Sequence, residues 1–227
     1  KLAAARDEHL PAVARAVVDV CHRLRADVRA IQPAKNALRA IATDERCLTP
    51  SGLVKLAEVQ LALGEAKGAL GSYGRALAID GRHGQALAGV AELYLARGDF
   101  ARAAETKQKL ARAEERADAK FRLFVEAAEL WSSRVRNLDK AIVALEEARD
   151  IKPDDPWVLH SLVGAYGDRQ QWHKLAATLR ALAAVEEPEE RRTKTLYALA
   201  KLTWKKLREP TTAGQIFEEV LDLDQLH

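Results

Sequence analysis

The sequence predicts an all-α protein built from repeated pairs of antiparallel helices. The main observation is a period, because residues 56–65 (LAEVQLALGE) return as residues 90–99 (VAELYLARGD) after a shift of 34. Fixed periods of about 20–50 residues are typical of stacked repeats rather than of one globular core. The composition agrees, since 48% hydrophobic and 30% charged residues with only 5% aromatic residues favour ordered, soluble helices.

Two positions, each occupied by alanine in four of five units, mark the helix pair in every repeat. In the first clear repeat, Ala69, Tyr73 and Ala76 follow a small, large, small spacing that places them on one helix face. The same two small positions recur in phase through five successive units. The first helix carries Ala57, Ala91, Ala128, Val163 and Ala200, and the second helix carries Ala69, Ala103, Ala141, Leu175 and Ala213.

The spacing of the repeats alternates. Successive small residues of the second helix are separated by 34, 38, 34 and 38 residues, so the true period is a pair of 72 residues. Residues 84–155 and 156–227 are then two copies of one double repeat. We expect the longer member of each pair to hold an extra residue between its helices, at residues 132–137 and 205–209.

This pattern resembles the tetratricopeptide repeat family, and the alternating 34/38 spacing resembles a bacterial-type array. The resemblance implies a right-handed superhelical solenoid in which the first helix of each pair lines a concave groove. The family's turn glycine is kept only as Gly64 and Gly98, and its closing proline only as Pro153. Lys107 and Pro210 also depart from the pattern, because both stand where the family places other residue types.

The predicted organisation is one continuous solenoid domain. Residues 1–48 are expected to hold a partial helix and a degenerate repeat, because Pro33 interrupts the pattern there. The helical patterns at both ends, together with the absence of Met, predict a segment of a longer array. The clear repeats occupy residues 49–83, 84–117, 118–155 (long), 156–188 and 189–227 (long).

The candidate binding residues lie on the first helices, on the side that the family resemblance makes concave. A glutamate follows the first small residue in three units, with Asp19 in the degenerate one, whereas the last unit carries lysines and has no acid from residue 191 to 208. This change of sign predicts a partner segment with basic residues toward the N-terminal units and acidic residues toward the C-terminal unit. Charges that serve only solubility and helix propensity are the alternative. The predicted partner-binding residues are Glu58, Leu61, Glu92, Leu95, Glu129, Lys194, Lys201 and Lys205.

Two further patterns have structural interpretations. Gly68, Gly71 and Gly74 fall three residues apart in one second helix, which indicates either a locally weakened helix or a face that another group approaches closely. The weakened helix is the favoured interpretation. Large aromatic residues recur near the middle or end of the first helices and are expected to pack in the core: Tyr94, Trp131, Tyr166 and Trp204.

No catalytic, metal or cofactor site is predicted. The six histidines are scattered without zinc-ligand spacing, there is no phosphate-binding loop, and residues 71–74 (GSYG) lie in a helical pattern rather than after a strand. A net charge of +3 with interspersed signs argues against a surface that coats nucleic acid. The sequence contains no run of about 18 apolar residues, so it does not predict membrane insertion. Cys21 and Cys47 are predicted to be reduced thiols, which favours the cytoplasm.

The sequence therefore predicts a non-catalytic scaffold for protein–protein interaction that binds a peptide or a helical segment of a partner in the concave groove. One alternative is a regulatory or sensor repeat region of a larger protein whose effector domain lies elsewhere. A second alternative, a helical-repeat nucleic-acid binder, is disfavoured by the acids at the repeated groove position. Pairing of the array edges with another copy of the chain stays open.

Overall fold

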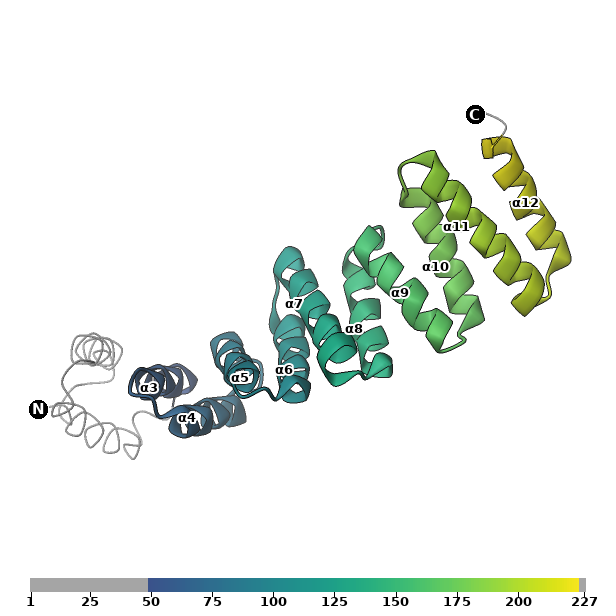
Figure 1. The fold of residues 1–227 in the computed structure, drawn as a ribbon. Coiled ribbons are helices and arrows are strands. Elements are labelled where there is room, and N and C mark those ends of the chain that lie inside the picture. Colours follow the sequence, from purple (N-terminus) through teal and green to yellow (C-terminus); the bar gives the residue numbers. More distant parts are fainter. Residues whose placement is uncertain (1–48, 225–227) are drawn as a thin grey trace, which may run out of the picture. The chain divides into compact units, whose positions relative to one another are not determined.

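The computed structural model describes residues 49–224, and the chain divides into two compact units, Lys1–Glu115 and Arg116–His227. The expectations for residues 1–48, including the degenerate repeat, Asp19, Cys21 and Cys47, lie outside the described residues. Within residues 49–224 the secondary structure is helical throughout and contains no strand (Figure 1). The predicted all-α fold of helix pairs is therefore confirmed over these residues.

The helices follow one another as short antiparallel hairpins (Figure 1). In the first unit they are α3 (Pro50–Ala62), α4 (Ala66–Ile79), α5 (Gly84–Ala96) and α6 (Phe100–Ala113). In the second unit they are α7 (Ala117–Glu129) with its π-helical end η5 (Leu130–Val135), α8 (Leu138–Ile151), α9 (Pro156–Asp168), α10 (Trp172–Val185), α11 (Glu189–Leu202) with its π-helical end η6 (Thr203–Leu207), and α12 (Pro210–Asp224).

Side chains and prolines set the starts of these helices. Asp99, Asn137 and Asp155 each accept a hydrogen bond from the backbone N–H three residues later, at 3.0–3.2 Å. Such caps satisfy N–H groups that the first helical turn leaves unpaired. Pro156 and Pro210 are the first residues of α9 and α12, a position where the missing N–H costs nothing. The departure from the family pattern at Pro210 is therefore compatible with its helix.

Nine of the ten predicted small positions are buried, whereas Val163 of α9 is only partly buried. In the first unit Ala57 of α3 and Ala69 of α4 are 0% exposed, and Ala103 of α6 is equally enclosed. Ala128 and Ala141 repeat the arrangement between α7 and α8 at 1% and 0% exposure. Because protein interiors are close-packed, a residue without a long side chain is what lets the two backbones approach at each crossing.

Each hairpin turns at a residue with left-handed backbone conformation. These residues have φ between 54° and 77°, and their spacing repeats the intervals 34, 38, 34 and 38. Glycine adopts this conformation without steric cost, whereas the other residue types adopt it against a modest one. Three of the five corners therefore have the same backbone conformation without a glycine. The five corner residues are Gly64, Gly98, Arg136, Gln170 and Arg208.

The extra residue of the long repeats lies inside the first helix and not in the connection. At the short corners the closing backbone hydrogen bond joins residues five apart, as from Asp99 N to Tyr94 O at 2.9 Å. At the long corners it joins residues six apart, from Asn137 N to Trp131 O at 2.8 Å and from Glu209 N to Thr203 O at 3.2 Å. The π-helical ends η5 and η6 take up the additional residue.

Two of the three glycines of α4, Gly71 and Gly74, lie on an open face, where an added Cβ would have no neighbouring atom within 4 Å. A Cβ on Gly68 would lie 3.1 Å from the side-chain amide of Gln60, which is a close contact. Gly71 and Gly74 therefore agree with the favoured interpretation of a locally weakened helix, whereas at Gly68 another side chain does approach closely.

Candidate binding surface

The acidic positions of the first unit occupy equivalent places on α3 and α5. The Glu58 side chain is 39% exposed and the Glu92 side chain is 72% exposed. Leu61 and Leu95 follow three residues later on the same helix faces and are half-buried. The structure therefore brings together, on each of two neighbouring helices, one solvent-accessible carboxylate and one partly accessible leucine.

Both carboxylates already have a cation nearby. The Lys55 ammonium donates to Glu58 Oε2 at 2.8 Å, and the Lys107 ammonium lies 3.9 Å from Glu92 Oε1. Lys107 is itself only 12% exposed, so its apolar stem fills the position that Tyr73 fills in the preceding repeat. The sequence marks Lys107 as a departure from the family pattern, and Glu92 is one of the groups near its charge.

The second unit carries the other predicted residues. Glu129 is exposed at the end of α7, in a different unit from Glu58 and Glu92. The equivalent placement of the acidic positions is therefore described only for Glu58 and Glu92. Lys194 and Lys201 of α11 and Lys205 of η6 are all exposed. Their spacing of seven and four residues puts them on one helix face.

The prediction that aromatic residues of the first helices pack in the core is right for one tryptophan and one tyrosine position and wrong for another tryptophan. Trp131 and Tyr166 are buried, at 1% and 0% exposure, as expected. Trp204 was expected in the core but is 56% exposed, and the physical reason is its register. The buried aromatic stands three residues after the first small position, as Trp131 does after Ala128, whereas Trp204 stands four residues after its own small residue. Counting from the small residues could have identified this side chain as exposed.

Tyr197 is a surface aromatic that the sequence reasoning missed. It is 49% exposed on α11, and its ring meets the Phe217 ring of α12 edge-on with centroids 5.8 Å apart. The Lys201 ammonium lies 5.4 Å from the centroid of the same tyrosine ring. Its spacing of three from Lys194 and four from Lys201 was the available signal.

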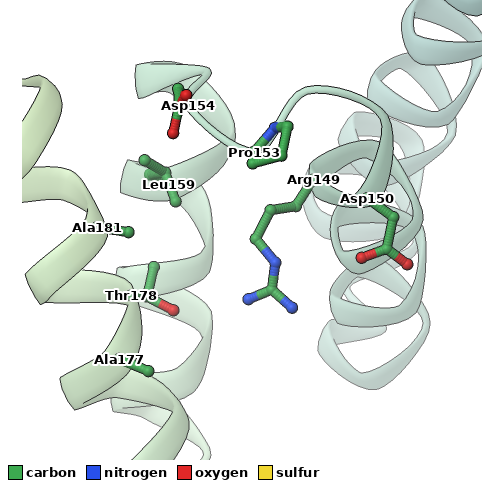
Figure 2. A pocket seen from close by; sticks show the side chains of 8 residues that line it. All are labelled: Arg149, Asp150, Pro153, Asp154, Leu159, Ala177, Thr178 and Ala181. Carbon is green, nitrogen blue, oxygen red and sulfur yellow. The ribbon is translucent and has the colours of Figure 1, made fainter.

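A pocket of about 510 Å³ opens between α8, α9 and α10 (Figure 2). Figure 2 shows the Arg149 side chain extending from α8 toward Thr178 on α10. The Thr178 hydroxyl donates to the backbone carbonyl of Lys174 at 2.8 Å and is not a free nucleophile. No sequence prediction pointed here. The lining residues are Arg149, Asp150, Pro153, Asp154, Leu159, Ala177, Thr178 and Ala181.

A polar cluster ties α8 to α9 and α10. The Tyr166 hydroxyl and the Lys174 ammonium both donate to Glu146 Oε1, each at 2.7 Å. Partial burial opposes ionisation of Glu146, but the hydrogen bonds from Lys174 and Tyr166 outweigh it and lower the pKa of this carboxyl. Burial first, and then the hydrogen bond and charge of Glu146, raise the pKa of the Tyr166 hydroxyl far above its ordinary value.

Alkaline solution is expected to destabilise the second unit through Tyr166. Because the folded-state pKa of Tyr166 lies above the value of about 10 for an unfolded chain, the stability it confers is fully present below pH 10. That stability is lost as the pH rises toward the folded-state pKa, by up to about 1.4 kcal/mol per pH unit. Urea unfolding at pH 9, 10 and 11 measures the slope. Tyr166→Phe should reduce the fall of the unfolding free energy with pH, whereas Tyr94→Phe, at the equivalent position of α5, should leave it unchanged. Equal slopes in the wild type and both variants would show that Tyr166 is not the cause.

No group of three or more His, Cys, Asp and Glu side chains within residues 49–224 is placed to hold a metal ion. The enclosed carboxylate of Glu186, 6% exposed, accepts a hydrogen bond from the Thr195 hydroxyl at 2.5 Å and lies 3.5 Å from His160. Over the same residues, none of the helices combines the length and apolarity needed to cross a membrane.

These features define the class of fold. Antiparallel helix pairs, buried alanines at most of the crossing positions and left-handed corners in a 34/38 register together give the described helices a tetratricopeptide-like repeat fold. What distinguishes this chain within that class is the pair of acidic positions on α3 and α5 and the lysines and aromatic residues on α11 and η6.

No protein-family model matches the chain, and no curated protein matches it. Solved structures similar to this chain include YrrB, which is described as a TPR protein with an unusual peptide-binding site. The two sequences are 17% identical, the match covers 83% of this chain and 92% of YrrB, and the TM-score is 0.43. PilF of Pseudomonas aeruginosa has 17% identity, coverage of 96% and 93%, and a TM-score of 0.41. MamA of Desulfovibrio magneticus RS-1 has 18% identity, coverage of 78% and 96%, and a TM-score of 0.38. Function is therefore inferred from this chain's own residues.

Proposed function

We propose that this chain is a non-catalytic scaffold whose first helices bind a peptide or a helical segment of a partner protein. The observation that supports it is the repeated pair of a glutamate and a leucine on α3 and α5, two helices that contact each other. A partner segment with basic and apolar side chains at matching intervals would meet the same chemistry twice. Function in a repeat protein depends on such surface residues rather than on the fold.

The existing ion pairs do not prevent this binding. The pairs of Glu58 with Lys55 and of Glu92 with Lys107 involve carboxylates that are 39% and 72% exposed. Exposed pairs of this kind contribute about 0–1 kcal/mol, because water and salt screen them. A cationic side chain of a partner can therefore replace Lys55 at little cost, and it can share the exposed Glu92 carboxylate with Lys107, which is itself 12% exposed. Acids at this position also favour a protein partner over a nucleic acid, whose phosphates they would repel.

Charge reversal tests the proposal. A phage library of random 12-residue peptides is panned on the intact chain, and the enriched peptides are titrated by fluorescence anisotropy. We expect peptides with Lys or Arg and leucine, and at least about tenfold weaker binding to a variant with Glu58→Lys, Glu92→Lys and Glu129→Lys. The matched control, with Glu115→Lys, Asp168→Lys and Glu218→Lys, has the same net charge and should bind as the wild type.

Two outcomes would contradict the proposal. One is the absence of any enriched basic peptide, or equal binding by the wild-type and reversed chains. The other is tight, salt-sensitive retention of the chain on heparin or single-stranded DNA at physiological salt, which would favour the helical-repeat nucleic-acid binder. Thermal unfolding of every variant, followed by circular dichroism, separates lost binding from lost folding.

A further inference from the structure

One face of α11 and η6 carries alternating lysines and aromatic residues, all of them exposed. We call this face the lysine–aromatic strip and define it as Lys194, Tyr197, Lys201, Trp204 and Lys205. Successive members are three, four, three and one residues apart, which keeps them on one side of the helix. Tyr197 and Trp204 are 49% and 56% exposed, so the strip presents two large rings among its ammonium groups.

The exposure of Trp204 results from a one-residue shift. In the repeats of α7 and α9, the residue three after the small position is an enclosed aromatic, Trp131 or Tyr166. In the last repeat that place is taken by Thr203, which is 2% exposed and donates its hydroxyl to the Leu199 carbonyl at 2.9 Å. The indole follows one residue later and therefore points away from the helix pair. Core packing thus does not account for a tryptophan at this position.

The apolar part of the strip extends onto α12. The Tyr197 ring packs edge-on against Phe217, with centroids 5.8 Å apart, and Leu221, one turn further along α12, is 55% exposed. The edge-on contact restrains the tyrosine ring before any ligand arrives. Restrained, partly exposed aromatic rings carry much of the binding energy in protein interfaces, because they bury a large area at a small entropic cost.

The charged part of the strip is positive, and the acids that pair with its helix lie outside residues 191–208, as Glu190 does for Lys194 and Glu219 for Arg192. Residues 191–208 contain seven lysines and arginines and no acid. Lys201 lies over the Tyr197 ring at 5.4 Å from its centroid, and the partner of Lys194 is Glu190, one turn away and 74% exposed. Such an exposed pair is weak, so a ligand carboxylate can replace it.

We propose that the lysine–aromatic strip binds an acidic segment of a partner protein in which an aromatic or leucine side chain lies next to carboxylates. This inference rests on the proposed function and assigns to the second unit a partner chemistry opposite to that of α3 and α5. Glu190 lies beside the strip at one end, and Glu209 follows it at the other. The positive stretch is therefore confined to one helix, which suits a short peptide better than the backbone of a nucleic acid.

A subtractive selection tests the inference. The same 12-residue phage library is panned on the intact wild-type chain while a soluble variant with Lys201→Glu, Trp204→Ala and Lys205→Glu competes for peptides that bind elsewhere. We expect enrichment of peptides with two or more Asp or Glu beside Trp, Phe or Leu. The Kd of the synthesised peptides should rise at least about tenfold with Lys201→Glu and Lys205→Glu, and about fivefold with Trp204→Ala alone.

The controls make each outcome decisive. Lys67→Glu with Lys109→Glu makes the same change of charge on exposed positions of α4 and α6 and should leave the Kd unchanged. Thermal midpoints of all variants should agree within about 2 °C, because the altered side chains are exposed. Failure to enrich acidic peptides overturns the inference, as does binding of a fluorescent 15-nucleotide oligo-dT in their place. Dimerisation of the free chain that Trp204→Ala abolishes also overturns it, because a second copy would then be the occupant.

Failure of this inference and failure of the proposed function give different results. If only the ligand of the lysine–aromatic strip is wrong, basic peptides still bind with an affinity that Glu58→Lys and Glu92→Lys reduce, and no acidic peptide binds. If the scaffold function itself is wrong, neither selection yields peptides whose affinity depends on the predicted residues.

Discussion

Replacing Trp131 with alanine is expected to destabilise the second unit by about 3–5 kcal/mol. The indole is 1% exposed in the π-helical end of α7, and the Lys140 ammonium lies 4.3 Å from the centroid of its ring. Truncation removes the largest enclosed side chain of this region and leaves a cavity that the surrounding helices fill only in part. Urea unfolding of the intact chain, followed by circular dichroism at 222 nm, measures the loss.

Trp204→Ala is the matched control for that experiment. It removes the same number of atoms from the end of another first helix, but the side chain is 56% exposed. A change within about 0.5 kcal/mol is expected, because surface substitutions away from special contacts rarely exceed it. Equal destabilisation by the two substitutions would show that the assignment of one tryptophan to the core and the other to the surface is wrong.

Gly89→Ala is expected to destabilise the first unit although alanine is the better helix former. A Cβ on Gly89 of α5 would lie 2.6 Å from Tyr73 Cε2 and 2.7 Å from Tyr73 Oη. The tyrosine is 4% exposed, so its ring has no free space into which to move. Overpacking of this kind costs about 1–3 kcal/mol, which exceeds the roughly 0.5–1 kcal/mol that helix propensity returns. Chemical unfolding of the intact chain gives the net sign.

Two companion substitutions identify the cause. Gly71→Ala, on the open face of α4, should stabilise the chain by about 0.5–1 kcal/mol, because nothing lies within 4 Å of the added methyl group. In a background with Tyr73→Leu, which copies Leu145 and Leu179 of later repeats, Gly89→Ala should change sign and become stabilising. Destabilisation by Gly89→Ala that persists in this background would point to the backbone of α5 and not to the tyrosine ring.

The repeated spacing of small residues was enough to predict the helix pairs. Ala57, Ala69 and Ala141 were chosen from spacing alone, and all three are fully enclosed at helix crossings. A short side chain is required wherever two helices approach closely, and that requirement leaves a periodic mark in the sequence. The corners at Arg136 and Arg208 leave no such mark, because packing of the flanking helices holds a backbone conformation that these residues do not favour by themselves.

The candidate surface was predictable only in part. The spacing of the lysines on α11 was enough to predict that they share one helix face, because residues seven apart lie on the same side of a helix. The nearness of Lys107 to Glu92 could not, because the two residues belong to different helices and the ion pair depends on how those helices pack. Trp204 was misassigned because its residue type suggested the core, whereas one residue of register decides its environment.

The π-helical ends η5 and η6 have a consequence for how such a chain can change in copy number. Each widened turn returns the backbone to the same left-handed corner after one additional residue. The corners at Gly64 and Gly98 both close across five residues, so the hairpins α3–α4 and α5–α6 are two short members in succession. Alternation of short and long hairpins therefore begins only at α5, and gain or loss of a single short hairpin is compatible with the stacking that the first unit already shows.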